Sequence, residues 1–305
     1  MIGTMTDTIV EVKNLSRKFD TKIALDNVDF TITRGVVMGL VGENGAGKTT
    51  LIRHLMGLLK PQSGTVSVFG KNPVKDPEGA LSHIGYLSEN REMLDWMPLD
   101  ELMSFTAAFY PDWDWDYAHQ LIETFRLDPA KRVCDYSRGQ RAQAGLILAV
   151  AHHPDLLLLD EPSSGLDPIV RKDILGEIIH TVTNAGKTVL FSSHLLDEVE
   201  RVADTITFLS EGKKLLTSPL TELLESWKMI TLRGATSLTQ FPAIPGIVTS
   251  DKRGNEWVIT TQTSMDTLSP LFQKYQFEVL AVNPMSLNDI FIAKVGRSAQ
   301  NGNES

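Results

Sequence analysis

The stretch that decides the fold reads Gly42-Glu43-Asn44-Gly45-Ala46-Gly47-Lys48-Thr49. Glycines at this spacing let backbone N–H groups point inward around a chain of phosphates, and a following helix presents its positive end to the same anion. A continuous apolar run at residues 35–41 precedes the stretch, and apolar residues recur at helical spacing after Lys48. The loop therefore lies between a buried strand and a helix, which is the context that a phosphate-binding loop requires.

The residues of this loop have expected roles toward a nucleoside triphosphate. Lys48 would bridge the β- and γ-phosphates, Thr49 would ligate Mg²⁺ through its hydroxyl, and Thr50 would contact the α-phosphate. A purely structural glycine turn is the alternative, and it leaves the Lys-Thr-Thr run unexplained. The other predicted nucleotide-binding residues of the loop are Gly42, Glu43, Asn44, Gly45, Ala46 and Gly47.

Two acidic residues, Asp160 and Glu161, follow four leucines at residues 156–159. The leucines read as a buried strand, so the two carboxylates lie at its carboxyl end, where open parallel sheets bind ligands. We expect Asp160 to hold Mg²⁺ through water and Glu161 to hold the attacking water as general base. The alternative is an acidic strand end with solvated charges.

His194 follows the next predicted buried strand, at residues 188–191. It can reach a γ-phosphate as a hydrogen-bond donor, whether cationic or neutral. A structural role is the alternative for a single histidine at a strand end. With Lys48 and Glu161 it completes a predicted catalytic set, and the order of these segments predicts that the chain binds ATP with Mg²⁺ and cleaves the γ-phosphate.

Composition limits the class of protein. The chain is 42% hydrophobic and 22% charged, which is ordinary for a soluble globular protein, and its longest apolar runs are too short to span a bilayer. The N-terminus has neither a basic start nor an apolar core, so we expect no secretory signal.

The single cysteine, Cys134, cannot form an internal disulfide, which indicates a reducing cytoplasm. The net charge of -9 argues against a general nucleic-acid binder, and any membrane contact is expected through a partner.

A further segment, Tyr136-Ser137-Arg138-Gly139-Gln140, precedes a helix predicted over residues 139–151. Serine is a favoured N-cap, so one interpretation is a helix start and nothing more. The other is that Ser137, Gly139 and the helix dipole face a γ-phosphate.

With these segments in this order, the chain resembles the nucleotide-binding subunits of ABC transporters from about residue 9 to residue 216. Residues 136–140 match the signature of that family, which is usually Leu-Ser-Gly-Gly-Gln, and residues 164–167 (Ser-Gly-Leu-Asp) match its D-loop. Phe19 matches the aromatic residue that stacks on adenine. The runs at 109–114 and 286–291 look like the single-domain ATPases of the ABC-2 type exporter group.

The resemblance implies a divided site. In that family two nucleotide domains pair head to tail, and the signature of each closes on the ATP held by the glycine loop of the other. Transferred to this sequence, Ser137, Gly139, Gln140 and Asp167 would contact nucleotide bound by a second chain.

The sequence departs from the family pattern at two positions. Arg138 replaces the first glycine of the signature, where its long cation would either add a phosphate contact or pair with an acidic neighbour. Glu89 stands where the family usually has a glutamine that contacts magnesium and senses the membrane partner. A carboxylate can still ligate Mg²⁺, but its added charge should alter nucleotide affinity.

Apolar and aromatic residues crowd the segment after Glu89. One interpretation is that they form the core of a helical subdomain. The alternative is that a few line an exposed groove that receives a short helix from a membrane subunit, which is where the family resemblance places the membrane contact. These residues are Met93, Leu94, Trp96, Met97, Phe105, Phe109, Tyr110, Trp113 and Trp115.

The predicted fold class is α/β, a P-loop NTPase core of RecA-like type with an antiparallel β subdomain and an α-helical subdomain, plus a small C-terminal α+β domain. The ATP-binding domain is expected over residues 7–220, with the helical subdomain at about 90–153. The C-terminal domain is expected over 226–296, followed by a disordered tail over 297–305.

The local patterns behind this prediction are alternating apolar residues for strands and helical spacing for helices. Beyond the segments named above, strands are expected at 9–19, 24–32, 64–70, 229–232, 247–250, 257–261 and 277–282, and helices across most of 99–153 and at 169–183, 195–203, 265–275 and 287–295.

The sequence therefore predicts the ATP-hydrolysing, energy-coupling subunit of an ABC transporter, and by resemblance an exporter. It would act as a homodimer, or a heterodimer with another ATPase subunit, on separate transmembrane permease subunits. It would lie in the cytoplasm, peripheral on the inner face of the cell membrane, with no nucleic-acid partner. Two alternatives stay open: a soluble ABC-type ATPase acting on proteins or nucleic acid, and an ATP sensor without turnover.

Overall fold

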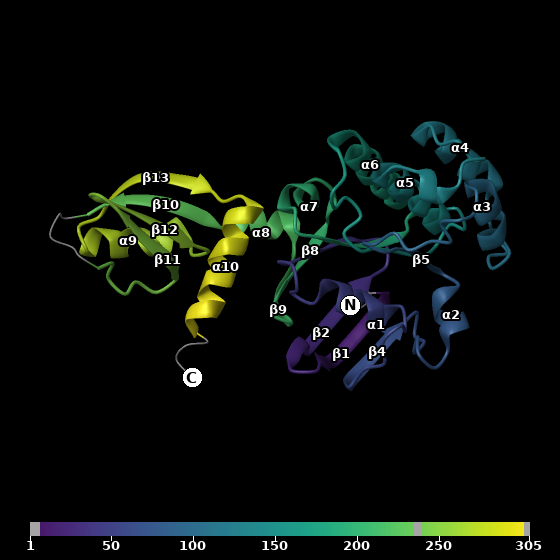
Figure 1. Cartoon of the computed structure of the whole chain (residues 1–305). Helices are drawn as coiled ribbons and strands as arrows, with labels where there is room; N and C mark the ends of the chain where they lie inside the picture. The colour runs from purple at the N-terminus through teal and green to yellow at the C-terminus, as the bar shows by residue number, and fades with distance from the viewer. Residues whose placement is uncertain (1–6, 235–239, 302–305) are drawn as a thin grey trace, which may run out of the picture. The chain divides into compact units, whose positions relative to one another are not determined.

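The computed structural model describes residues 7–234 and 240–301, with the backbone alone for 178–185 and 296–301. The chain divides into two compact units, the first ending at Thr217 and the second beginning at Ser218 (Figure 1). Helix α8 (Leu220–Ser226), which the predicted boundaries left between the two domains, therefore belongs to the second unit.

A six-stranded sheet forms the centre of the first unit, and its strands from β5 to β8 pair in parallel. Every residue of β3, β6 and β7 is buried, which is the pattern of strands covered on both faces. Because parallel strands end at one edge, the segments that follow β3, β5, β6 and β7 meet there. In sheet order the strands are β5 (Ile84–Leu87), β6 (Leu156–Leu159), β7 (Thr188–Ser193), β3 (Val37–Val41), β8 (Thr205–Ser210) and β9 (Lys213–Pro219).

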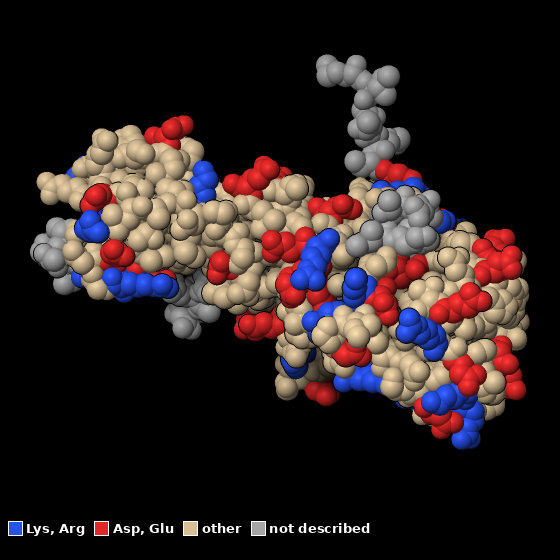
Figure 2. Space-filling view, turned by 90° about the horizontal axis from the view of Figure 1, so that it is seen from above, with Lys and Arg blue, Asp and Glu red and all other residues tan. Residues whose placement is uncertain are grey.

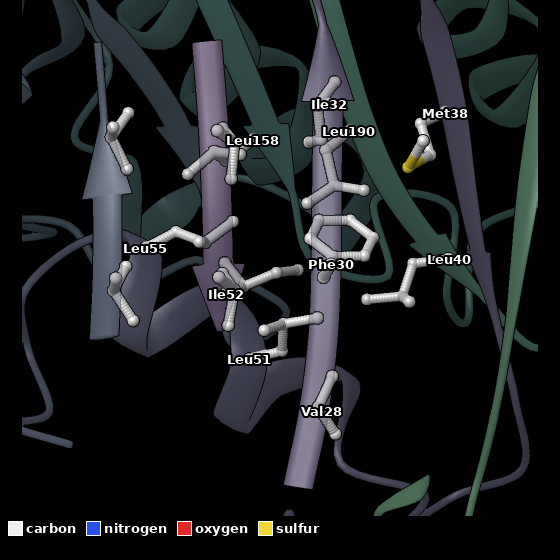
Figure 3. Close-up of a cluster of buried hydrophobic side chains, with 14 of the residues drawn as sticks. Val28, Phe30, Ile32, Met38, Leu40, Leu51, Ile52, Leu55, Leu158 and Leu190 are labelled. Carbon is white, nitrogen blue, oxygen red and sulfur yellow. The ribbon is translucent and has the colours of Figure 1, made fainter. Parts of the chain in front are cut away.

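A second, antiparallel sheet of the order β2-β1-β4 accounts for the predicted β subdomain. Its strands are β1 (Thr8–Phe19), β2 (Lys22–Thr33) and β4 (Ser63–Val68). Buried side chains of this sheet, of helix α1 (Lys48–Leu55) and of the central sheet form one continuous core. In Figure 3, Phe30 and Ile32 of β2 lie beside Leu158 and Leu190 of the central sheet, with Ile52 of α1 nearby. This packing fixes the loop before α1 against both sheets.

The region predicted as mostly helical, 99–153, contains three α-helices separated by loops, and Pro111 and Asp112 lie in the loop between the first two. Helix α4 begins at an N-cap, Asp114, whose carboxylate accepts a hydrogen bond from the Tyr117 N–H at 2.9 Å. Besides α1, the helices described in the first unit are α2 (Pro77–Leu81), α3 (Leu99–Ala107), α4 (Trp115–Phe125), α5 (Arg138–Val150), α6 (Pro168–Ala185) and α7 (Leu196–Val202), with a short 3₁₀ turn, η1 (Val133–Asp135).

The second unit is an antiparallel sheet of the order β11-β12-β10-β13 with helices α8, α9 and α10. Its own core contains Ile230, Trp257, Leu268 and Phe272. The remaining elements are β10 (Lys228–Arg233), β11 (Ile247–Arg253), β12 (Glu256–Thr261), α9 (Met265–Lys274), β13 (Glu278–Pro284) and α10 (Leu287–Asn301).

Helix α10 corrects the expectation for the C-terminal end. The helix was expected to stop near residue 295 and a disordered tail to cover 297–305, but α10 continues to Asn301. The sequence Arg-Ser-Ala-Gln-Asn at 297–301 contains no proline, and a single glycine at 296 costs a helix only about 1 kcal/mol. The rest of the predicted tail, 302–305, lies outside the described residues.

The surface carries both signs of charge. On the face shown in Figure 2, Asp and Glu side chains are interspersed with Lys and Arg, and the basic side chains do not gather into one continuous patch. In the part of the chain that the structure describes, no helix combines the length and the apolar character needed to cross a membrane.

Candidate active site

The glycine loop connects β3 to α1 in a conformation that requires glycine at specific positions. Gly45 and Gly47 have φ angles of 83° and 110°, which side-chain-bearing residues rarely adopt. A Cβ at position 47 would also lie 2.5 Å from the carbonyl oxygen of Ala24. Gly47 is the N-cap of α1 and provides no side-chain cap, so the N-terminus of the helix is left open to an anion.

Lys48 is the first residue of α1, and its side chain is almost fully buried, at 5% exposure. Its Nζ donates hydrogen bonds to the carbonyl oxygens of Gly42 at 2.6 Å and Glu43 at 3.2 Å. The same ammonium lies 3.1 Å from Oε1 of Glu161. A buried ammonium needs such partners, and here they hold it beneath the loop.

Asp160 and Glu161 follow β6 and are both buried. Ser192 of β7 joins them, because its hydroxyl donates to Asp160 Oδ1 at 2.8 Å and accepts from the Glu161 N–H at 2.8 Å. Glu161 has a φ of 47°, in the left-handed region, and this turn directs its carboxylate away from that of Asp160 toward Lys48 and His194.

His194 follows β7, as predicted, and its Nδ1 lies 2.7 Å from Oε2 of Glu161. The Glu161 carboxylate is therefore held between an ammonium on one oxygen and an imidazole on the other. This arrangement fixes the orientation of a carboxylate that could accept a proton from water.

Asp160 fits a role as a metal ligand. Burial raises the pKa of its carboxyl group, and hydrogen bonds from Ser192 and Thr49 oppose that rise. Its Oδ2 is buried without a hydrogen-bond partner of ordinary geometry, so one oxygen is available to a cation.

Glu89, Thr49 and Asp160 all line one hollow beside the loop, although no group of three or more His, Cys, Asp or Glu residues is placed to hold a metal among the described residues. Mg²⁺ usually takes one or two carboxylates and completes its shell with phosphates and water, so this oxygen set suits it.

A cavity of about 330 Å³ opens over the glycine loop. Phe19 contributes to its wall, is partly exposed, and carries the Arg17 guanidinium 4.6 Å from its ring centroid. The predicted nucleotide-binding residues that line this cavity are Phe19, Asn44, Gly45, Gly47, Lys48, Thr49 and Thr50, and the predicted metal ligand Glu89 and base Glu161 line it too.

The signature residues do not line this cavity. Ser137 is the N-cap of α5 and forms a reciprocal capping box with Gln140: its hydroxyl accepts from the Gln140 N–H at 3.2 Å, and its own N–H donates to Gln140 Oε1 at 3.0 Å. Gly139 packs against Val170 of α6, where a Cβ would lie 3.0 Å from the valine side chain. Asp167 caps α6 by accepting from the N–H groups of Ile169 and Val170.

Arg138 forms no ion pair with a carboxylate among the described side chains, so of its two alternatives the acidic pairing is not found there. Its guanidinium lies against Gly165, where a Cβ would be only 2.3 Å from Nη1. Arg91, which the sequence analysis did not select, is buried and donates to the backbone carbonyls of Pro162 and Ser164 at 3.4 and 3.0 Å. Two arginines therefore contact the segment 162–165.

Comparison with known proteins agrees with this geometry. The family model described as ABC transporter matches residues 25–164. The ABC transporter ATP-binding protein YhaQ of Bacillus subtilis (strain 168) is 30% identical over 298 residues, which cover 94% of this chain and 99% of the relative. This chain belongs to the ABC transporter family of ATP-binding proteins. It is an ATPase, since this family hydrolyses ATP to power transport.

Other ABC relatives are similarly distant. ABC transporter ATP-binding protein YtrB of Bacillus subtilis (strain 168) is 28% identical over 288 residues, covering 94% of this chain and 98% of YtrB. The bacitracin transport ATP-binding protein BcrA of Bacillus licheniformis is 32% identical over 219 residues, covering 71% of each chain. A solved ATP-binding subunit of an ABC transporter superposes with a TM-score of 0.65 at 28% identity, covering 72% of this chain and 92% of the other.

These comparisons confirm the predicted fold class and ATPase activity. They do not favour the two alternatives, a soluble ATPase without a membrane partner and an ATP sensor without turnover.

Several residues of the ABC site were missed by the sequence analysis. Lys22, which falls between the strands expected at 9–19 and 24–32, lines the cavity beside Phe19. Ser192 could have been found as a polar residue at the end of a buried strand, and Arg91 as a cation two positions after Glu89. Strand β5, which delivers Glu89 to the shared edge, was also missed, because Ile-Gly-Tyr-Leu is short and contains a glycine.

Proposed function

We propose that this protein is the energy-coupling subunit of an exporter, working as a dimer that encloses ATP and acts on separate transmembrane subunits. The observation that carries the proposal is the Glu161 carboxylate, held between Lys48 and His194 at the carboxyl ends of parallel strands. A general base at this edge, beside an open helix N-terminus, suits attack by water on a terminal phosphate.

The proposed chemistry assigns one step to each residue. Lys48 and the N–H groups of the glycine loop bind the β- and γ-phosphates. Glu161 takes a proton from a water molecule while the oxygen of that water bonds to the γ-phosphorus. The bond between the γ-phosphorus and the oxygen that leaves with the β-phosphate breaks. His194 orients Glu161 and donates to the γ-phosphate. Thr49, Glu89 and Asp160 would hold Mg²⁺, which would neutralise charge on the phosphate oxygens.

The position of the signature supports the proposed dimer. Ser137 and Gly139 lie outside the cavity that contains Lys48, so a nucleotide bound there has no contact with them in the same chain. The N-terminus of α5 is nevertheless a suitable anion site, with a helix of 13 residues behind it. We propose that Ser137, Gly139, Gln140 and Asp167 close on nucleotide held by a second chain, identical or related.

The membrane partner is proposed to dock in a groove of about 640 Å³ in the first unit. None of the nine apolar residues after Glu89 is fully buried, so the core interpretation is wrong for this set. Phe105 is 46% exposed, and it lines the groove together with Leu94, Leu58 and Tyr110. The same hollow is lined at one end by Thr49, Glu89 and Asp160, and its apolar part suits one face of a short amphipathic helix from a transmembrane subunit. Through it the protein would sit on the cytoplasmic face of the membrane.

The test is Glu161→Gln, which preserves shape and removes the base. We expect ATP binding to be retained, turnover to fall by roughly 10²-fold or more, and the ATP-bound dimer to live longer. Phosphate release, equilibrium ATP binding and light scattering measure the three quantities.

Glu200→Gln is the matched control, because Glu200 is an exposed carboxylate on α7 outside the site and should leave all three unchanged. Turnover of Glu161→Gln near that of the parent would remove Glu161 from the role of base.

A further inference from the structure

Glu198 is a buried carboxylate that the proposed mechanism does not use. It lies on α7 and is only 1% exposed. Its Oε2 accepts a short hydrogen bond from the hydroxyl of Ser163 and faces the hydroxyl of Ser193 at 3.4 Å. Its Oε1 lies 3.1 Å from Nε of Arg171, near the start of α6. A carboxylate this deep in the protein is costly unless such partners hold it.

These contacts connect the two backbone segments that carry the proposed base and its histidine. Ser163 is two residues after Glu161, and Ser193 directly precedes His194. Since His194 also lies 2.7 Å from Glu161, a closed ring of covalent and polar links runs through six residues: Glu161, Pro162, Ser163, Glu198, Ser193 and His194.

The ring restricts relative movement of two strand ends. Strands β6 and β7 pair as far as Leu159 and Phe191, and Ser192 adds a link to Asp160 and Glu161. Ser163 and His194 lie beyond that pairing, where a shift of a fraction of an ångström separates a productive from an unproductive contact. Glu198 is the member that contacts both segments from outside, and Arg171 extends the same network to α6, directly after the D-loop residues 164–167.

We propose that Glu198 is a positioning residue for ATP hydrolysis, which holds the Ser163 and Ser193 segments in the register that brings His194 to the carboxylate of Glu161. The inference rests on the proposed roles of Glu161 and His194. Burial raises the pKa of the Glu198 carboxyl group, and the hydrogen bond from Ser163 and the charge of Arg171 oppose that rise. The protonation state of Glu198 therefore depends on its protein contacts rather than on solvent.

The test compares Glu198→Ala and Glu198→Gln with Val199→Ala in the full-length protein. Val199 is the next residue of α7, is fully buried and contacts Gly39 rather than the ring, so it reports destabilisation of the helix alone. We expect Glu198→Ala to lower kcat by about 30-fold or more, with KM for ATP within about threefold of the parent, since the glycine loop is unchanged. Glu198→Gln should recover part of kcat, because an amide oxygen can still accept from Ser163.

Ser163→Ala provides a second route if Glu198→Ala does not fold. It removes one donor, leaves the carboxylate in place, and should lower kcat with KM unchanged. Loss of kcat in Val199→Ala equal to that in Glu198→Ala, or a raised KM with parental kcat, would overturn the proposal. If Glu161 is not the base, Glu161→Gln will keep the turnover of the parent, whatever the result for the Glu198 variants. Failure of the proposed function can therefore be told apart from failure of the Glu198 proposal.

Discussion

His152 shows how one buried ring can make stability depend on pH. It is 6% exposed, stacks on Tyr110 with ring centroids 3.8 Å apart, and its Nε2 lies 3.2 Å from the carbonyl oxygen of Ile84. Its Nδ1 is buried without a hydrogen-bond partner, so protonation would place an unsatisfied N–H in the interior. Burial is the main reason that the pKa of His152 is lowered to about 4.

We expect His152→Gln to reduce the loss of stability on acidification. An unfolded histidine binds a proton below about pH 6.5, whereas folded His152 does so only near pH 4. Between these values the unfolded state binds more protons, so the stabilising contribution is complete above the unfolded pKa and is lost as pH falls. The parent should lose about 2 kcal/mol more than the variant between pH 7.5 and 5.0. Urea denaturation at both pH values measures this, and parallel losses in the two proteins would contradict it.

Residues of the site divide into those that local sequence reveals and those that it does not. Lys48, Asp160 and His194 could be predicted because each follows a recognisable strand with a fixed spacing. The partners of Ser192 and Glu198 could not be predicted, since they lie about 30 residues or more away in sequence, on a neighbouring strand or loop. A contact of this kind exists only once the register of the parallel strands is known.

At the scale of elements, Ser137 at the start of helix α5 can have a structural role, a functional role or both. Ser137 forms a complete capping box with Gln140, so the structural role is present in the single chain. The functional role needs the same N-terminus to face an anion on a second molecule. The two can be separated because aspartate caps a helix as well as serine does but repels phosphate.

We expect Ser137→Asp to fold as stably as the parent, within about 0.5 kcal/mol, yet to lose ATP-dependent dimerisation and most turnover. Ser137→Ala should lose about 1 kcal/mol of stability through the missing cap. Chemical denaturation and light scattering with ATP distinguish the effects. Asp114→Asn, a cap exchange on α4, controls for cap chemistry away from the site. Parental dimerisation and turnover in Ser137→Asp would leave only the capping role.

Elements were easier to predict than their ends. The strands 156–159 and 188–191 were expected from continuous apolar runs, and β6 and β7 lie there. Helix α2, strands β8 and β9 and helix α8 were missed, because short elements contain too few residues for a period to be detected. The helix predicted over 139–151 begins at Arg138, one residue earlier, since Ser137 supplies the cap.

At the scale of the whole molecule, each of the two units has a core of its own among the described residues, and an exposed groove lies in the first. The first unit contains every predicted site residue, and the second contains an independent cluster around Trp257 and Phe272. The sequence predicted the α+β character of the second unit but offered no ligand-binding pattern in it. The groove after Glu89 was one of two interpretations, because aromatic residues occur both in cores and at binding surfaces.

We expect Phe105→Glu to abolish association with the transmembrane partner while leaving the ATPase activity and stability of the purified protein nearly unchanged. The reason is that Phe105 is already partly exposed, whereas a docked apolar helix would bury the new charge. Detergent co-purification with the polytopic protein that accompanies the parent measures the association. Ile292→Glu on α10 changes an exposed apolar residue outside the groove and should retain it. Retention in both variants would exclude the groove as the docking surface.

The contact between Lys48 and Glu161 has a consequence for affinity. Before any phosphate arrives, the ammonium is already neutralised by a carboxylate of the same chain, 3.1 Å away. Binding of a triphosphate is therefore an exchange of one anion for another. The binding free energy that a titration yields includes the difference between the free energies of the two ion pairs. The same competition frees the carboxylate at the moment the γ-phosphate takes the lysine, so that loading the substrate also releases the group that would deprotonate water.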